Sequence, residues 1–542
     1  MPRHTISAAL LGALLILQGC PSEDPADDDT TGDDTTGDDD TGDDDTGDDD
    51  TGDDDTGEEP TLDDRVDHAL SRYHEARVLI LERVVTEGGT VERAEWEGWL
   101  EPDAALALSE DDLDALRQRH ADDIEVARNA AIADSVIDVD GFRSEPATVT
   151  QFCTELPKGA MLHVHPGGTR DRETVDALLA VLDPLVDGGA ILVDANDGVS
   201  TMLYADEVAW LETLPVLQYS AFDAKDQDRI AELLLLPETP PTHDFMRFEA
   251  LFSIGDALLK QDPKMESWVT ETTHRDFLER ASSLGVSYVE YTKVVIPPSE
   301  AQFEAFADLS GTMLQETGVE TRWNLAFVRT LPASSNSMWT QVLIALLEQE
   351  QPEVLVGIDL LANETDAPAL ETAQPIYVPI LDAVQQGNIE LGRTMHAGEL
   401  GDPRNPRDAM IMGSQRIGHG VLMADDPLTI EYARREQVPV EINLVSNLRL
   451  EVWDDPATHP FLDYLRLGLP VSLSTDDEGM FRTDIANECV VAVTSTDIQY
   501  AELAQMSRNS IAEGFMDDEL RDTLMVDLEA DLAAFELSWS GR

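Results

Sequence analysis

The stretch Arg393-Thr-Met-His-Ala-Gly-Glu399 combines a strand-like segment with a histidine and a glutamate, and it is central to the predicted fold. Ile389 and Leu391 precede it, so we interpret the stretch as a buried strand that ends in a histidine. Gly398 allows the backbone to turn sharply after the strand, and the turn presents Glu399. Histidine is a good zinc ligand, and a glutamate three residues later can exchange a proton with a substrate held on the metal. By itself the pair is weak evidence, because most His-x-x-Glu pairs arise by chance on protein surfaces.

Short apolar segments recur along the chain from residue 160 onward. Several lack a clean alternation of apolar and polar residues, which is typical of strands buried on both faces in a parallel sheet. Helical patterns lie between many of them, for instance at 339–347 and 428–435. We therefore predict an α/β fold, a (β/α)₈ TIM barrel. Its strands are expected near 160–165, 286–292, 322–328, 354–360, 390–396, 415–419, 438–444 and 470–475.

The first crossover of this barrel, from about Thr174 to Leu284, is too long for a single helix. We expect it to hold a mostly helical insertion that covers the mouth of the barrel. At the other end of the chain, residues 517–539 are predicted to form a closing helix.

Residues suited to metal binding and acid–base chemistry stand where the predicted strands end. Catalytic residues of such barrels lie at the carboxyl ends of the strands, on one face of the molecule. Because these ends meet, we predict one common site. Its candidates are His163, His165, His396, Glu399, His419, Asp476 and Asp477. The other seven histidines, including His459, are predicted to be surface or packing residues.

The chain is strongly acidic, with a formal net charge of -75 at pH 7 over 542 residues. This charge argues against nucleic acid or an anionic membrane as the main partner. The sequence has no Cys-x-x-Cys and no His-Glu-x-x-His, which excludes a cytidine-deaminase type of zinc site and a zincin protease. A disulfide bond between Cys153 and Cys489 is compatible with the sequence but not implied by it.

The first 20 residues are predicted to be a lipoprotein-type signal peptide. Leu17-Gln-Gly-Cys20 resembles a bacterial lipobox, although Gln18 departs from the usual small residue. An ordinary signal peptide cut elsewhere is the alternative. Residues 21–61 are Thr-Gly-Asp-rich and acidic, which predicts a disordered tether. We expect an exported protein, anchored through lipid at Cys20 on the outer membrane or cell surface, or else secreted.

Residues 62–150 are predicted to form a helical extension, and residues 151–542 the barrel. Apolar residues recur at roughly helical spacing from Val66 to Val84, and Gly88-Gly89 interrupts the pattern. We find no catalytic constellation in the extension. It is expected to serve packing or dimerisation, which leaves a homodimer open.

Four motifs together resemble the adenosine deaminase family of metal-dependent amidohydrolases. They are residues 157–165, 394–399, 416–420 and 474–477, with supporting matches at 288–291, 356–360 and His459-Pro460. The Pro-Lys-Gly start at Pro157 and the helical extension look most like the secreted, growth-factor-related branch of that family. The resemblance covers about Phe152 to Phe515 and skips much of the insertion.

The resemblance implies a role for each candidate. His163, His165, His396 and Asp476 would hold one zinc ion per chain, with water in the open position. His419 would orient that water and help to take its proton, and Asp477 would accept hydrogen bonds and help to hold a purine. Glu399 would give a proton to the ring nitrogen next to the attacked carbon. The implied reaction is deamination of adenosine or a related aminopurine nucleoside; the alternatives are another amidohydrolase reaction and a non-catalytic surface binding protein.

Two positions depart from the family where it contacts substrate. Gly167 stands near the place of an aspartate that contacts the sugar, and Asp171 is the nearest residue that can replace it. Ala362 stands where the family often has a glycine that contacts the base. We expect both Gly167 and Ala362 to face the substrate. Deamination is therefore better supported than adenosine as the substrate.

Overall fold

The computed structural model describes residues 59–193, 199–237, 245–365 and 367–540. The predicted signal peptide and residues 21–58 of the predicted tether lie outside these ranges. Among the described residues, no helix is both long enough and apolar enough to cross a membrane.

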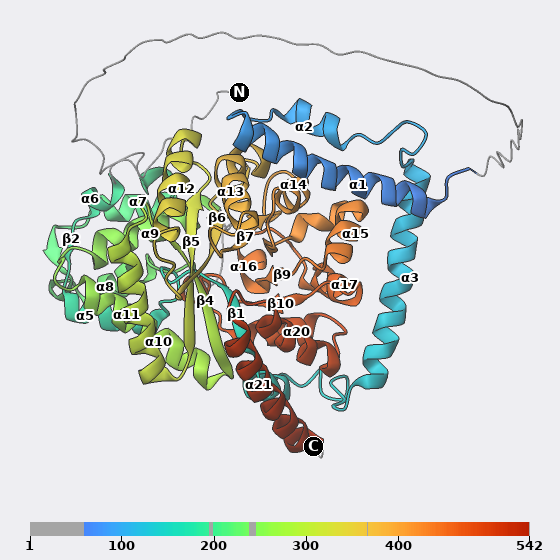
Figure 1. The fold of residues 1–542 in the computed structure, drawn as a ribbon. Helices are drawn as coiled ribbons and strands as arrows, with labels where there is room; N and C mark the ends of the chain where they lie inside the picture. The colour runs from blue at the N-terminus through green and yellow to red at the C-terminus, as the bar shows by residue number, and fades with distance from the viewer. Residues whose placement is uncertain (1–58, 194–198, 238–244, 366, 541–542) are drawn as a thin grey trace, which may run out of the picture.

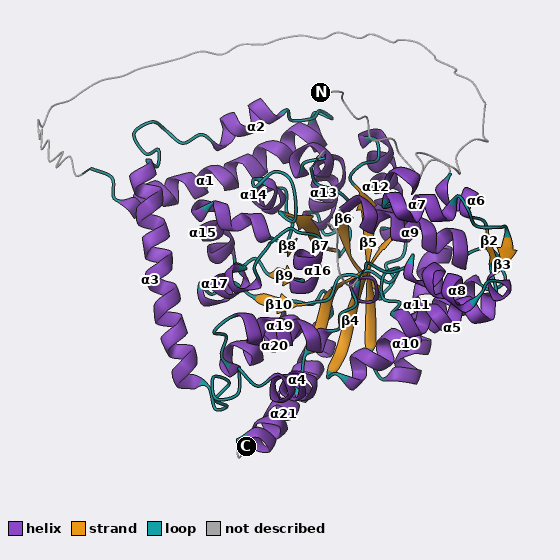
Figure 2. Ribbon diagram, turned by 180° about the vertical axis from the view of Figure 1, so that it is seen from behind, coloured by secondary structure: helices purple, strands orange, loops and turns teal. Residues whose placement is uncertain are grey.

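A sheet of eight strands forms the centre of the molecule, in the order β1-β4-β5-β6-β7-β8-β9-β10 (Figures 1 and 2). Every neighbouring pair in it is parallel. The strands are Gly159–Val164 (β1), Val286–Val294 (β4), Glu320–Val328 (β5), Leu355–Leu361 (β6), Gly392–Ala397 (β7), Arg416–His419 (β8), Val440–Ile442 (β9) and Val471–Leu473 (β10). A parallel bridge between Val164 and Asp476 joins the two edges, so the sheet is a nearly closed barrel. The predicted fold is confirmed, and each predicted strand is present.

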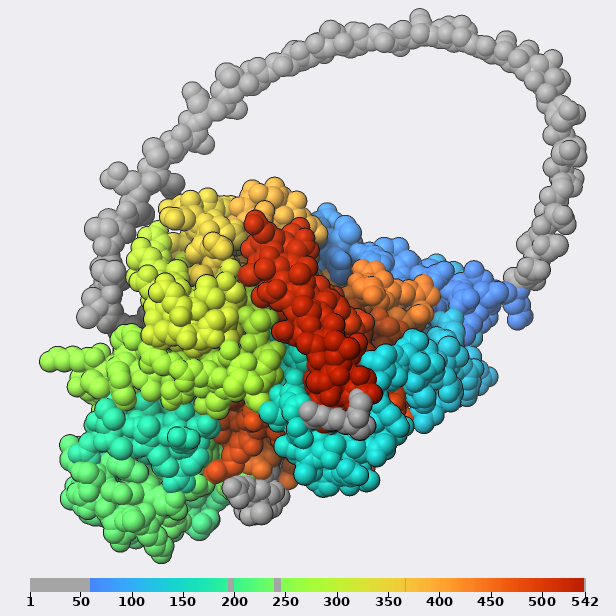
Figure 3. Space-filling view, turned by 90° about the horizontal axis from the view of Figure 1, so that it is seen from below, coloured from blue at the N-terminus to red at the C-terminus, as the bar shows by residue number. Residues whose placement is uncertain are grey.

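Helices cover the outside of the barrel, so its strands are buried on both faces. Strands β1 and β8, for example, are buried throughout. The crossover and flanking helices are α11 (Glu300–Thr317), α12 (Ala333–Leu347), α13 (Ala369–Gln385), α14 (Asn405–Ile411), α15 (Pro427–Glu436), α16 (Leu444–Arg449), α17 (Phe461–Arg466), α18 (Glu478–Phe481), α19 (Ile485–Ser495), α20 (Tyr500–Ala512) and α21 (Asp518–Trp539). Helix α21 is the predicted closing helix, and Figure 3 shows it lying across one face of the molecule.

The long first crossover holds the expected helical insertion, which also contains a two-stranded antiparallel sheet. It lies on one side of the barrel and has a hydrophobic core of its own (Figure 1). Its elements are α5 (Arg172–Leu182), β2 (Leu185–Val186), α6 (Gly188–Leu192), α7 (Ala205–Leu211), β3 (Leu217–Gln218), α8 (Ala224–Glu232), α9 (Phe245–Leu259) and α10 (Glu266–Ser283).

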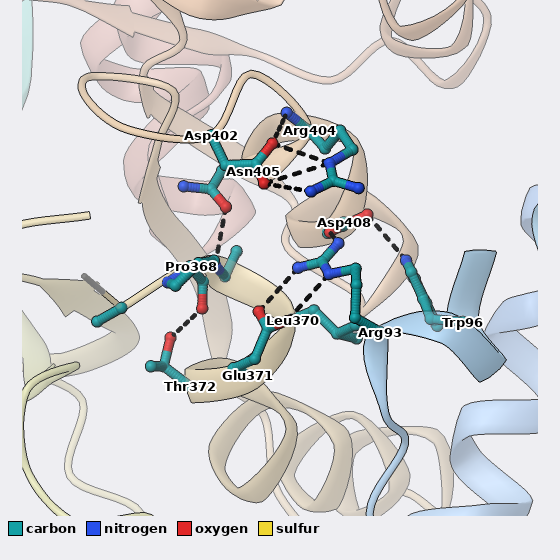
Figure 4. Close-up of polar contacts among 12 residues, drawn as sticks. Arg93, Trp96, Pro368, Leu370, Glu371, Thr372, Asp402, Arg404, Asn405 and Asp408 are labelled. Atoms are coloured by element: carbon teal, nitrogen blue, oxygen red, sulfur yellow. Dashed lines mark hydrogen bonds and ion pairs between the residues drawn. The ribbon is translucent and has the colours of Figure 1, made fainter. Parts of the chain in front are cut away.

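The N-terminal helices lie on the opposite side of the barrel (Figure 1). They are α1 (Leu62–Leu81), a π-helical turn (Glu82–Thr86), α2 (Arg93–Leu100) and α3 (Glu110–Asp134). The fourth helix of this region, α4 (Pro146–Glu155), packs instead against α19 and lies beside α21 (Figure 2). Figure 4 shows how α2 binds to the barrel: Trp96 Nε1 donates a hydrogen bond of 2.9 Å to Asp408, and Arg93 pairs with Asp408 and Glu371. The extension is therefore packed on α13 and α14. A dimerisation role stays a prediction.

A disulfide bond joins Cys153 of α4 to Cys489 of α19, with the two Cα atoms 5.6 Å apart. Both cysteines are buried in the main core. The bond joins α4, which leads into β1, to α19, the second helix after β10. It therefore lies close to the place where the barrel closes.

The barrel interior contains a buried ion network instead of a purely apolar core. Arg416 lies 2.6 Å from Glu290 and 2.6 Å from Glu441, and the three side chains are at most 1% exposed. Thr394 Oγ1 donates to Glu441 at 3.1 Å, and Asn324 Nδ2 donates to Glu290 at 3.1 Å. Buried charges are tolerated only when they are paired and hydrogen-bonded in this way.

Replacing Arg416 should therefore be costly. We expect Arg416→Leu to lower the free energy of unfolding by about 3–5 kcal/mol, because two buried carboxylates lose their counter-charge. Chemical denaturation measures this change. The control is Arg404→Leu, whose side chain is 45% exposed and pairs with Asp402; its expected cost is below about 1 kcal/mol. Equal costs for the two variants would contradict this view of the network.

Candidate active site

Four side chains from three places in the chain converge at the carboxyl end of the barrel. His163 lies in β1, His165 directly after it, His396 in β7, and Asp476 after β10. Nε2 of His165 lies 3.2 Å from Nε2 of His396 and 3.1 Å from Oδ1 of Asp476. Nε2 of His163 lies 3.7 Å from the same carboxylate oxygen.

These positions fit a zinc ion. Ligands at about 2.0–2.1 Å from a tetrahedral zinc lie roughly 3.3 Å from one another, which is close to the separations above. Nε2 of His163 is buried and has no hydrogen-bond partner within the described part of the chain. Burial opposes a charged His165, yet the negative charges of Asp477 and Asp476 outweigh it and raise the pKa of His165 to about 10. The surroundings therefore favour a cation at this point.

A second layer of carboxylates and a hydroxyl orients the candidate ligands. Nδ1 of His163 lies 2.9 Å from Glu441, and Nδ1 of His396 lies 2.9 Å from Asp359. Ser446 Oγ donates a hydrogen bond of 2.7 Å to Asp476. The hydrogen bond between Nδ1 and Glu441 fixes the tautomer in which Nε2 of His163 offers its lone pair to a metal. The contact of His396 with Asp359 has an ion-pair distance but no hydrogen-bond geometry.

The backbone is strained at three strand ends around this cluster. Ala362, His419 and Asp476 have positive φ angles of 86°, 64° and 60°. Such conformations are uncommon for residues other than glycine and gather at functional sites. Here they set the directions of His419 and Asp476 as the chain leaves β8 and β10.

Glu399 is held in a turn that Glu364 organises. Glu364 accepts hydrogen bonds from the backbone N–H of Gly398 at 3.0 Å and of Glu399 at 2.9 Å. Glu399 is 5% exposed. Burial raises the pKa of Glu399 well above its ordinary value, and the negative charges of Asp476 and Glu364 add to the effect. Both effects favour the protonated form of Glu399, as its predicted role requires.

Asp477 lies beside the cluster, against the loop that follows β1. A Cβ atom at Gly168 would lie 1.8 Å from Oδ1 of Asp477, so only glycine fits there. The carbonyl of Gly168 accepts the N–H of Gly479 at 2.9 Å, which joins this loop to α18. Burial raises the pKa of Asp477 well above its usual range, with a further contribution from Asp476.

The two predicted substrate contacts lie at the same end of the barrel. Gly167 follows β1 and faces Phe252 of α9, whose ring would lie 3.3 Å from a Cβ atom at Gly167. Ala362 directly follows β6. Asp171 is engaged elsewhere, since it accepts the N–H of Thr174 at 2.8 Å to cap α5 and pairs with Arg280 at 3.2 Å. Contact of Gly167 and Ala362 with substrate stays a prediction.

Sequence reasoning missed three residues that support the site. Glu364 holds the Glu399 turn, and Asn447 lies 3.0 Å from His419. His459, predicted to be a surface or packing residue, is buried and contacts Asn447 at 3.1 Å. The His459-Pro460 motif was a usable signal, but nothing in the sequence placed it next to His419.

Comparison with known proteins gives one family. A family model described as adenosine deaminase matches residues 227–530. An aminodeoxyfutalosine deaminase of Streptomyces avermitilis is 28% identical over 268 residues, which are 47% of this chain and 72% of that protein. An adenosine deaminase of Enterococcus faecalis is 30% identical over 170 residues, 31% of this chain and 48% of that protein.

Solved structures show the same barrel fold. An adenine deaminase from Arthrobacter aurescens has a TM-score of 0.51 at 23% identity, covering 69% of this chain and 98% of that one. An amidohydrolase from Burkholderia ambifaria, solved with bound zinc, has a TM-score of 0.53 at 17% identity, covering 72% and 95%.

The geometry predicts which variants lose metal. We expect His163→Ala and Asp476→Ala to bind far less zinc than the wild type after dialysis, because each removes one of four ligands. Elemental analysis of the purified protein measures the zinc content. His74→Ala on α1, where the side chain is 51% exposed, is the matched control and should keep about one zinc per chain. Full zinc occupancy in either site variant would contradict the assignment.

Proposed function

Because the chain belongs to the adenosine deaminase family, we propose that it catalyses the zinc-dependent hydrolytic deamination of adenosine or a related aminopurine nucleoside, with release of ammonia. It is an enzyme of the adenosine deaminase type. The observation that carries the finer proposal is the convergence of His163, His165, His396 and Asp476 beside a buried Glu399 whose pKa is raised.

Each residue has a distinct role in this reaction. A zinc ion held by the four ligands would lower the pKa of a bound water toward about 7 and so supply a nucleophile. Glu399 donates its proton to the ring nitrogen next to the attacked carbon, which makes the ring more electrophilic. The oxygen of water bonds to that carbon; one of its two protons passes to the amino group, which leaves as ammonia, and the other returns to the Glu399 carboxylate. Asp477, held against Gly168, helps to fix the purine.

The relatives favour aminated purines as the substrate class. Their names refer to adenosine and to aminodeoxyfutalosine, and one solved structure is that of an N6-methyl-AMP deaminase from Arabidopsis thaliana. Other solved relatives are complexed with IMP or GMP. We therefore propose a purine nucleoside or a close derivative as the substrate. Another amidohydrolase reaction is the enzymatic alternative, and a panel of aminated purines assayed for ammonia release distinguishes the two.

A non-catalytic binding protein is the weaker alternative. A barrel kept only for interaction has no need of four metal ligands, a second layer of carboxylates and a protonated acid in one place. The four candidate ligands, the carboxylates beside His163 and His396, and the raised pKa of buried Glu399 therefore support a catalytic site.

We also propose that the enzyme acts outside the cytoplasm, anchored through lipid at Cys20. The lipobox-like stretch at 17–20 supports this, as does the Cys153–Cys489 disulfide bond, since such bonds persist in oxidising compartments. Mass spectrometry of the native amino terminus tests it, and an unmodified terminus beyond Cys20 would rule out the anchor.

The role of Glu399 predicts both a variant and a pH dependence. Glu399→Gln should keep its zinc and lose about 10²–10⁴-fold in kcat, because an amide cannot supply the proton. Glu390→Gln, at an exposed position before β7, is the matched control and should behave like the wild type. In the wild type, kcat should fall as the pH rises through the raised pKa of Glu399, since the carboxylate form has no proton to give. A Glu399→Gln enzyme close to wild-type activity would show that another group is the acid.

The lack of a side chain at Gly167 predicts weak recognition of the sugar. Asp171 does not compensate, because its carboxylate caps α5 and pairs with Arg280. A lost hydrogen bond to a charged partner is worth about 1.5–3 kcal/mol. Adenosine, 2′-deoxyadenosine and 5′-deoxyadenosine should therefore have kcat/KM values within about tenfold of one another. A loss far above a hundredfold for 5′-deoxyadenosine would mean that another residue reads the 5′-hydroxyl.

A further inference from the structure

A chain of three hydrogen bonds runs from the backbone of Phe461 to His419. The N–H of Phe461 donates to Nδ1 of His459 at 3.3 Å. Nε2 of His459 lies 3.1 Å from Oδ1 of Asn447, and Nδ2 of Asn447 lies 3.0 Å from Nδ1 of His419. All four residues are at most 4% exposed. The chain starts at a backbone N–H, a group that can only donate.

This starting point fixes the direction of every later bond. Nδ1 of His459 accepts a hydrogen bond from the N–H of Phe461, so it carries no proton of its own. Burial lowers the pKa of His459 to about 3, so the ring is neutral and its one proton is on Nε2. Nε2–H therefore donates to Asn447, and the atom of Asn447 that faces it must be the carbonyl oxygen.

The direction continues through Asn447 to His419. With its oxygen on His459, the amide of Asn447 turns its NH₂ group toward His419, and an NH₂ group only donates. Nδ1 of His419 must accept, so a neutral His419 carries its proton on Nε2. Glu399 does not compete for Nδ1, because its Oε1 atom is 3.8 Å away, beyond hydrogen-bond distance.

The last residue of this hydrogen-bond chain, His419, faces the candidate metal ligands. The His419 ring lies 4.8 Å from the ring of His163 and 5.2 Å from that of His396, measured between centroids. Nε2 of His419 is buried and has no hydrogen-bond partner among the residues that the structure describes. The positive φ angle at His419 is part of what sets this orientation.

We propose that Asn447 and His459 are positioning residues that fix the proton of neutral His419 on Nε2, so that His419 faces the reaction as a hydrogen-bond donor. The catalytic consequence rests on the proposed function. Nε2–H donates a hydrogen bond to the nucleophilic oxygen and stabilises charge on it. Because a protonated Nε2 has no free lone pair, the proton that water loses passes to the Glu399 carboxylate, which has already given its own proton to the ring. This changes the role expected from the family resemblance, in which His419 also helps to remove a proton.

The test is the tautomer itself, measured by ¹⁵N–¹H correlation spectra of imidazoles in the full chain labelled with ¹⁵N-histidine. The protein is kept metal-free with a chelator, and the signals of His419 are identified by their loss in His419→Gln. We expect a protonated Nε2 and an unprotonated Nδ1 in the wild type. An Nδ1–H tautomer at His419 would overturn the proposal without any further variant.

Asn447→Asp is the sharpest variant, because a carboxylate has nearly the shape of the amide but only accepts. It should draw the proton of His419 to Nδ1 and reverse the tautomer. With zinc restored, kcat should fall by about 10²-fold, the effect of losing one aimed donor. The matched control is Asn129→Asp on the exposed face of α3, which should change neither the spectrum nor kcat. A folded Asn447→Asp protein with an unchanged tautomer would contradict the proposal.

His459 supplies a second pair of variants in case Asn447→Asp does not fold. His459→Gln keeps a donor for Asn447 and should preserve the Nε2–H form of His419. His459→Leu removes the donor, frees the amide to rotate and should give a mixture of tautomers. If the two variants gave the same His419 signals, the proposed hydrogen-bond chain would be wrong. The spectra come from metal-free protein, so they test the tautomer independently of activity. If the Nε2–H tautomer is found but no aminopurine is deaminated, only the proposed function is wrong.

Discussion

The closure of the barrel between β1 and the segment after β10 is the contact on which the site depends. The N–H of Asp476 donates to the carbonyl of His163 at 3.1 Å, and the N–H of His165 donates to the carbonyl of Asp476 at 3.2 Å. These two bonds place two histidines beside a carboxylate that lies more than 300 residues away in the chain. The disulfide bond between α4 and α19 ties the same seam.

The site and the buried ion network of the barrel share one charged group, Glu441. Glu441 pairs with Arg416 inside the barrel and with Nδ1 of His163 at the site. The carboxylate that contacts the candidate metal ligand His163 is therefore also a member of the buried ion network. Because both pairs share Glu441, a displacement of this carboxylate would disturb the network and the position of His163 together.

Much of the fold and of the metal cluster could be predicted from the sequence. Segments such as 354–358 are apolar throughout, which is typical of parallel strands, and the histidines and aspartates stand at strand ends. The supporting layer could not be predicted, because it depends on packing between distant segments. Glu364 meets the Glu399 turn only through the fold, and His459 meets His419 only through Asn447. Asp171 is a further example: the sequence made it the nearest candidate for a sugar contact, but in the structure its carboxylate caps helix α5.

We propose above all that one zinc ion, held at the barrel seam, makes this chain a deaminase. The most direct test adds Zn²⁺ stepwise to metal-free enzyme and follows ammonia release from adenosine or from the most active aminopurine of the panel. We expect the rate to rise in proportion to added zinc and to reach its plateau at about one equivalent per chain. Full activity without zinc, or a rate that does not respond to zinc, would contradict the proposal.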